Sequence, residues 1–199
     1  MPYFPFLKIL KQFNWLDIFV VILLFRICYI AMKNGLAIEI FKLLGTIFAV
    51  YIACHYYAAI SDWIRQQIKD LVPARMPLDF LDYFCFTILV TARYLIFALL
   101  RSVFYSYIKF EAVPKLNKYG ALLFSLARSV LFIGLIIFIM VITNISYLKS
   151  SVRDSYMGPR IFQIVPDVYR WTWEKVMSRF MTKETFNMTV EEVRETFLR

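Results

Sequence analysis

Ionisable side chains interrupt an apolar run near the start of the chain, LFRICYIAMKNGLAIEIFKLLG, which contains Arg26, Lys33, Glu39 and Lys42. Hydrocarbon cannot satisfy a bare charge, so such a group must reach the membrane interface, pair inside the protein or line a water-filled path. The long stems of the three basic residues can reach an interface near the Asn-Gly pair of the run. The short side chain of Glu39 reaches less far, which makes this carboxylate the first candidate for chemistry.

Glu39 has two interpretations. Lys42 follows it by three residues and lies at a neighbouring position of one helix face, while Arg26 lies across the predicted turn. This spacing predicts a local ion pair. The alternative is a functional carboxylate on a path for a proton or a solute.

Arginine side chains provide the other candidates. Arg93 falls near the middle of the third apolar run, ILVTARYLIFALLRS, and Arg128 lies within the fourth. An arginine at the centre of a span costs about 2.5–3.5 kcal/mol, so Arg93 is expected to have a partner. The candidates are Glu39, Asp17, Asp82 or the carbonyls of a kinked helix. Arg93 then either locks two helices together or contacts a substrate.

Catalytic and metal-binding patterns are absent from the sequence. It contains no HExxH segment, no glycine-rich phosphate loop and no second histidine beside His55 that could complete a metal site. The cysteines Cys28, Cys54 and Cys85 are isolated within apolar runs, a spacing that fits neither a disulfide nor a metal site. We expect free thiols that fill small gaps, an interfacial hydrogen-bonding role for His55, no cofactor and no enzymatic activity.

The composition is that of a membrane protein. Of the 199 residues, 61% are hydrophobic and 19% are charged, and the mean hydropathy is +0.63. Soluble domains contain only about 45–50% apolar residues. The net charge of +9 comes from 23 Lys and Arg residues distributed between the apolar blocks. That distribution indicates anchors at the interface of a lipid bilayer rather than a nucleic-acid surface.

Four apolar segments are each long enough to cross a bilayer core of about 30 Å as a helix. Asn34 and Gly35 predict a tight helical hairpin between the first two, and Pro73 and Pro77 interrupt the connection to the third. The first segment is longer than a signal-peptide core and lacks a small-residue cleavage site, so we expect it to be retained. The predicted spans cover residues 15–32, 36–60, 80–108 and 119–148.

The fold class is therefore an all-α membrane protein with four transmembrane helices in two hairpins, since in no segment do polar and apolar residues alternate with period two as in strands. Residues 1–148 form the predicted transmembrane domain, and residues 149–199 form a polar, amphipathic helical tail. Small residues recur every fourth position on two spans, which predicts close packing of those helices. The residues are Gly45, Ala49 and Ala53 on the second span and Ala121, Ser125 and Ser129 on the fourth.

The tail interleaves aromatic and basic residues in the segment VYRWTWEKVMSRFM, which contains Arg170, Trp171, Trp173 and Lys175. Such a pattern is typical of a helix that lies in the headgroup layer, and it also fits a helix that caps the bundle or faces a partner. Farther on, a Thr at 189 and a Glu at 192 predict a capping box that opens a last helix, VEEVRETFLR.

Several of these residues resemble the colicin V production protein family. The resemblance lies in NWLD with Asp17, in Gly35 and Glu39 after the first span, and in HYY at residues 55–57. The segment KLNKYGALLFSLARS is similar to the Leu-Asp-Arg, Leu-Gly and Arg-Gly pattern of the family's final span, with Arg128 at a matching place.

Departures from the family pattern affect single positions. Asn117, between the matching Leu116 and Lys118, stands where the family has an acid, and Asn34 stands where it has an arginine. Three small residues, Ala121, Ser125 and Ser129, replace glycines. The resemblance covers the four spans and excludes the tail from Lys149.

The resemblance implies a four-helix protein of the bacterial cytoplasmic membrane, associated with colicin V production and export and with envelope upkeep. It brings no catalytic residue and no cofactor. The main hypothesis is a non-enzymatic protein that acts through contacts with other membrane or secretion proteins, with the tail as the docking segment and self-association as an option. The alternative is a small oligomeric transporter or channel that uses Glu39, Arg93 and Arg128.

Overall fold

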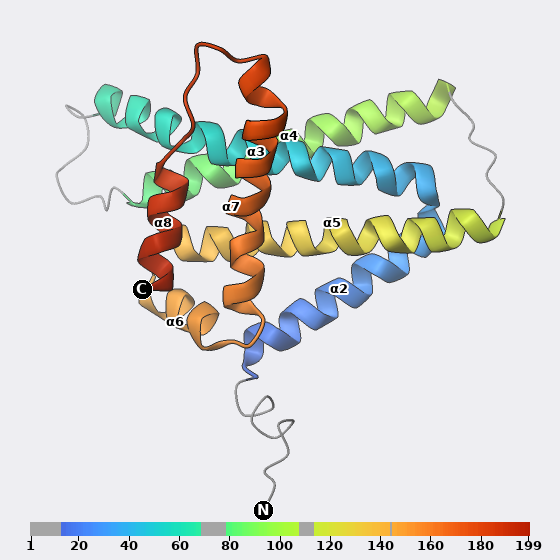
Figure 1. The fold of residues 1–199 in the computed structure, drawn as a ribbon. Helices are drawn as coiled ribbons and strands as arrows, with labels where there is room; N and C mark the ends of the chain where they lie inside the picture. The colour runs from blue at the N-terminus through green and yellow to red at the C-terminus, as the bar shows by residue number, and fades with distance from the viewer. Residues whose placement is uncertain (1–12, 69–78, 108–113, 144) are drawn as a thin grey trace, which may run out of the picture.

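The computed structural model describes residues 13–68, 79–107, 114–143 and 145–199, and these residues form helices and connecting segments without strands (Figure 1). This confirms the predicted all-α fold. Four of the helices are long and apolar enough to cross a membrane, and shorter helices follow them. The long helices are α2 (Trp15–Asn34), α3 (Leu36–Ile68), α4 (Asp79–Tyr107) and α5 (Pro114–Ile142). The shorter ones are α6 (Ser146–Asp154), α7 (Gly158–Lys175), the 3-10 turn η1 (Met177–Arg179) and α8 (Thr189–Leu198).

The helix bounds differ from the predicted spans by more than two residues at three ends. Helix α3 continues to Ile68, beyond the predicted end at residue 60, and α5 begins at Pro114, five residues before the predicted start at 119. Proline is well tolerated at the first position of a helix. Helix α5 ends at Ile142 rather than at 148, because Ile145 is extended and the chain then starts α6. The helix break predicted at Pro73 and Pro77 lies outside the described residues.

Gly35 is the single residue between α2 and α3. Its φ of 85° and ψ of 164° suit a residue without a Cβ, and a Cβ there would lie 2.9 Å from Oδ1 of Asn117. The same Oδ1 accepts a hydrogen bond of 2.6 Å from the backbone N–H of Leu36 and so caps the start of α3. Asn117 thus performs a capping role that an acid could also perform.

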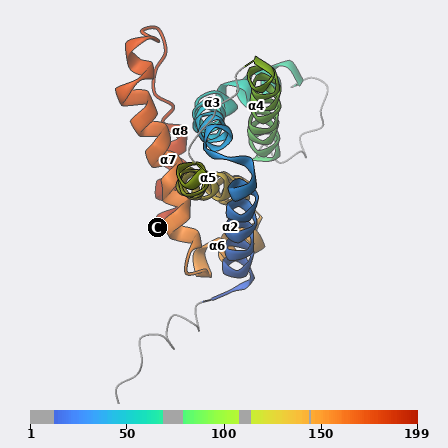
Figure 2. The same ribbon diagram turned by 90° about the vertical axis from the view of Figure 1, so that its right-hand side faces the viewer.

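The predicted turn between α2 and α3 is present, but the prediction that the two helices pack together as a tight hairpin is wrong. The two helices diverge from Gly35, and α2 packs mainly on α5, which also packs on α3 (Figures 1 and 2). Small side chains on α5 make this possible, because Ala121, Ser125 and Ser129 are fully buried. Close packing of the small-residue rows is confirmed. On α3, Gly45 lies so close to α4 that a Cβ would be 2.7 Å from the Phe97 ring.

The tail folds back on the spans. Helix α7 runs across α3 and α5 instead of along them, with α6 and α8 beside the end of α5 (Figures 1 and 2). One face of α7 is buried there, with Phe162, Val165, Tyr169 and Thr172 spaced by three or four residues. This face caps the bundle, in agreement with one of the two predicted interpretations of the tail.

The predicted capping box of the last helix is wrong. Thr189 is already the first residue of α8, and Met188 at the N-cap makes no side-chain cap. The side chain of Asn187 accepts the hydrogen bond from the Thr189 N–H instead, at 3.1 Å, while its amide donates to the Cys54 carbonyl at 2.7 Å. Asn187 therefore joins the start of α8 to α3, a long-range contact that the local pattern does not contain.

Candidate functional site

A buried ion-pair network surrounds Glu39 in the first turn of α3. Its carboxylate is fully buried, with Lys42 Nζ 2.7 Å from Oε1 and Arg128 Nε 3.0 Å from Oε2. The Asn34 side chain donates a further hydrogen bond to Oε1 at 3.1 Å. The helix N-terminus also favours a negative charge at this position. The ion pair between Glu39 and Lys42 expected from the spacing is present.

Arg26 does not complete this network. It lies exposed on α2 and has no ion pair among the described residues, whereas Arg128 of α5 occupies the second oxygen of Glu39. The reason is the divergence of α2 from α3, which leaves α5 as the neighbour of both helices. Lys33 lies near the turn, 4.6 Å above the ring of Tyr29.

Arg93 has aromatic partners in place of the predicted acids or carbonyls. Its guanidinium carbon lies 5.2 Å from the ring centroid of Phe48 and 5.0 Å from that of Phe97. Glu39 is engaged by Lys42 and Arg128, and within the described ranges Arg93 takes part in no ion pair. The expectation of an ion-pair partner is therefore wrong, and the structure shows cation–π contacts instead.

The two other candidate acids also have fixed partners. Asp82 accepts a hydrogen bond from Ser61 and pairs with Arg65 Nη2 at 2.9 Å. Asp17 is fully buried and accepts backbone N–H groups from Tyr156 at 3.1 Å and Met157 at 2.8 Å. The Asn14 N–H donates to Asp17 as well, at 3.0 Å, while the Asn14 side chain caps α2. Asp17 thus ties the start of α2 to the connection between α6 and α7.

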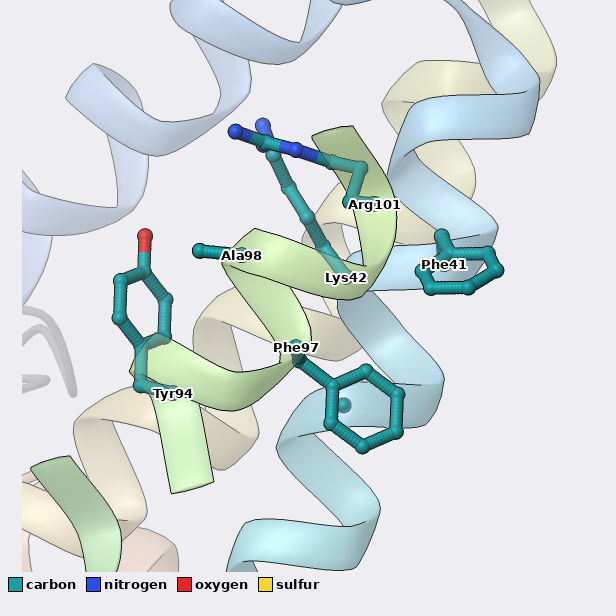
Figure 3. Close-up of a pocket in the computed structure, with 7 residues that line it drawn as sticks. Phe41, Lys42, Tyr94, Phe97, Ala98 and Arg101 are labelled. Carbon is teal, nitrogen blue, oxygen red and sulfur yellow. The ribbon is translucent and has the colours of Figure 1, made fainter. Parts of the chain in front are cut away.

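An open groove of about 490 Å³ lies between α2 and α4, with α3 and α5 behind it. Arg26 and Arg128 are its two charged lining residues. A smaller pocket between α3 and α4 shares Gly45 and Tyr94 with it and is lined by Lys42 and Arg101. Figure 3 shows that the side chains of Lys42 and Arg101 extend their nitrogen atoms in the same direction, to one side of the Tyr94 ring.

A second polar cluster fastens the tail to α3. His55 Nδ1 lies 2.9 Å from the Tyr169 hydroxyl, and His55 Nε2 lies 2.7 Å from Glu184 Oε2. The ring of His55 also stacks on that of Trp173, with centroids 5.1 Å apart. Burial raises the pKa of the Tyr169 phenol, so Tyr169 stays neutral and accepts the Asn187 N–H at 3.0 Å. His55 is a hydrogen-bonding residue, as expected, but the roles of Tyr169, Glu184 and Asn187 carry no local sequence signal.

The four candidate tail residues lie on different sides of α7. Trp173 faces His55, whereas Trp171 is 57% exposed and Lys175 is exposed. Arg170 pairs with Glu191 of α8 at 2.6 Å, and this contact raises the pKa of the Arg170 guanidinium. Trp173 and Arg170 therefore help to hold the tail together, and Trp171 and Lys175 remain on its outer surface.

Metal ligands do not gather in the described part of the chain, where no group of three His, Cys, Asp or Glu side chains could hold an ion. Cys28, Cys54 and Cys85 are free and buried, as predicted. Within the spans, the acids Asp17, Glu39 and Asp82 are held by ion pairs or hydrogen bonds.

These features define a multi-pass helical membrane protein with a folded tail. Residues 16–166 match the colicin V production protein family, which is more than half of the chain, and the chain belongs to that family. The match passes residue 148 and ends within α7, so the expected exclusion of the tail from Lys149 is wrong for its first part. A search of curated proteins found no match, and a search of solved structures found none either.

Proposed function

We propose that this protein supports the production or secretion of a colicin V-like toxin, or the upkeep of the envelope, from the bacterial cytoplasmic membrane. It acts through contacts with other proteins and without catalysis of its own. The family membership and the four apolar helices support this proposal. The tail provides the docking surface.

The observation that carries the proposal is a set of exposed apolar side chains on the tail. Trp171 is 57% exposed, Phe180 79% and Met188 62%, although the inner face of α7 is fully packed on the bundle. Lys175 and Arg179 are exposed beside them. Aromatic, Met and Arg side chains are enriched at protein interfaces and often dominate their binding energy. An apolar group of this kind on a polar tail suits a protein partner.

Site-specific crosslinking tests the docking surface. A photoreactive phenylalanine placed at Trp171 or Phe180 in the full-length protein should give a discrete crosslinked species in cells that secrete the toxin. The control position is Leu123, which is 68% exposed on α5 and faces lipid if α5 crosses the membrane. The same adduct pattern at all three positions would contradict a specific docking face.

A functional assay complements the crosslinks. The double substitution W171A/F180A should reduce toxin release while the protein stays at its normal level in the membrane. The control is L123A, which removes a side chain of comparable exposure from a span. Unchanged release in W171A/F180A would remove the support for the tail as the docking segment.

A small oligomeric transporter or channel remains the second proposal, and the groove lined by Arg128 is the observation that favours it. Glu39 is held by Lys42 and Arg128, and Arg93 lies between two aromatic rings, so Arg128 is the best placed of the three candidates. Liposome flux compared between the parent protein and R128L tests this proposal, with R93L as the comparison. No flux in the parent protein would end it.

A further inference from the structure

Positive charge accumulates around the groove between α2 and α4. Arg26 and Arg128 line the groove itself, and Lys42 and Arg101 line the adjoining pocket. Glu39 is the acid bound to this group, through Lys42 and Arg128. Four cations therefore face one carboxylate among the described residues.

The four cations belong to one cluster, although they come from four helices. Lys42 and Arg128 meet on the two oxygens of Glu39. Arg101 and Arg128 are both close enough to Lys42 for their charges to act on its ammonium group. Arg26 shares the groove with Arg128, and Figure 3 shows Arg101 directed to the same side as Lys42.

This cluster lies within the spans, toward the Gly35 turn. Arg26 precedes Gly35 by nine residues and Lys42 follows it by seven, which is about 10–14 Å along each helix at 1.5 Å per residue. Lys42 and Arg128 have side chains only 14% and 12% exposed. Cations at such positions either extend to the interface or pair with anions, and one carboxylate cannot neutralise all four.

The rest of the groove is mainly apolar and opens between two helices. Leu23, Ile27 and Ile30 line it from α2, and Phe132 and Leu135 line it from α5. Its volume of about 490 Å³ falls within the roughly 300–1,000 Å³ of small-molecule sites. On the α4 side, Tyr94 is 55% exposed at the edge of the groove, and Leu95 next to it is 57% exposed.

We infer that this groove binds an acidic phospholipid. The phosphate lies among Arg26, Lys42, Arg101 and Arg128, and one acyl chain lies along the apolar wall between α2 and α4. A guanidinium group can donate two parallel hydrogen bonds to two oxygens of a phosphate. Basic pockets between transmembrane helices bind acidic headgroups. A soluble anion would neutralise the same cations but would leave the apolar wall uncovered. This inference concerns the spans and is independent of the docking surface on the tail.

Lipid binding to the purified full-length protein in a neutral detergent tests the inference. Native mass spectrometry with added phosphatidylglycerol should show one lipid retained at concentrations where phosphatidylcholine is not. The informative variants are R26Q and R101Q, because neither arginine has an ion pair among the described residues. Each should weaken phosphatidylglycerol binding about fivefold, from roughly 1 kcal/mol for each basic residue near an acidic headgroup.

A matched control separates the groove from general attraction to a basic surface. Lys118 is exposed on α5 and does not line the groove or its adjoining pocket, so K118Q removes the same charge elsewhere. Equal retention of the two lipids, or a loss in K118Q as large as in R26Q, would overturn the inference. Folding of each variant is checked by its thermal unfolding without added lipid.

Two further arms distinguish a lipid from a free anion. Thr91 lines the groove on α4 and is exposed, so T91W should fill the space for the acyl chain and weaken lipid binding while all four cations remain. Inorganic phosphate should neither bind detectably nor compete with phosphatidylglycerol. Competition by phosphate together with full lipid binding in T91W would overturn the proposed acyl-chain site.

Discussion

Replacement of Asp17 by alanine should release the tail from the spans. The carboxylate accepts the N–H groups of Tyr156 and Met157, more than 130 residues away in the chain, and is itself fully buried. Alanine leaves both donors without a partner, at a cost of about 1–3 kcal/mol for each buried group. The sum is about 2–6 kcal/mol, and even about 2 kcal/mol corresponds to a roughly 25-fold rise in the opening equilibrium.

Limited proteolysis of the purified full-length protein, at a trypsin concentration low enough for reclosing to outpace cleavage, measures this opening. Trypsin cleavage after Arg153 or Arg160, which flank the tied connection, should accelerate in D17A, because cleavage follows the open population when opening and closing are fast. D17N should have an intermediate effect, since its remaining carbonyl oxygen can accept one of the two N–H groups. The control is D154A, because Asp154 is exposed close to the same connection. Equal cleavage rates in D17A and D154A would refute the proposed tie.

Other predictions follow from the spans. E39Q should lower stability by about 3–5 kcal/mol in thermal unfolding, because it leaves Lys42 and Arg128 buried without their counter-charge. G35A should cost about 1–3 kcal/mol, since alanine disfavours a φ of 85° and would displace the side chain that caps α3. R93M should cost no more than about 2 kcal/mol, the upper range of a cation–π contact. Cysteines introduced in place of Asn34 and Ser150 should react from opposite sides of the membrane, because Ser150 is exposed on α6, whose Ser151 contacts Trp15 at the other end of α2.

Each of these expectations has its own control. E174Q removes an exposed carboxylate from α7 and should leave stability unchanged, and a loss in E39Q no larger than in E174Q would contradict the role of the buried network. For Gly35, N117A should reproduce part of the loss by removal of the cap alone. A drop in R93M as large as that in E39Q would indicate an ionic partner for Arg93. Labelling of both cysteines from one side would contradict the four-span topology.

The Glu39 network connects local sequence with long-range packing. Glu39 and Lys42 are three residues apart, so any helix brings them together, and their ion pair could be predicted. Arg128 is 89 residues from Glu39, and its contact depends on the position of α5 between α2 and α3. The small residues that allow this packing are visible in the sequence. The sequence did not indicate which helices pack together through them.

Arg93 shows why the energetic argument from sequence was incomplete. The position of Arg93 within a span correctly indicated that its guanidinium needs a favourable contact inside the protein. That contact comes from two phenyl rings on α3 and α4 and not from an acid or a carbonyl. Phe48 is one turn after Gly45, where α3 and α4 approach closely, and this approach is a property of the packed pair. A partner search restricted to acids and carbonyls could not find the rings.

The sequence by itself determined that the chain has four apolar helices, that the first two are joined at Gly35, and that Glu39 pairs with Lys42. These features depend on hydropathy and on neighbours within one or two helical turns. Hydropathy determines which segments can lie in a membrane, and helix geometry determines which side chains within a segment are neighbours. Only the tertiary structure decided that α7 crosses the bundle, that His55 and Asp17 hold the tail, and that four cations from four helices surround one groove. Such contacts join residues far apart in the chain, and their energy exists only after the helices have packed.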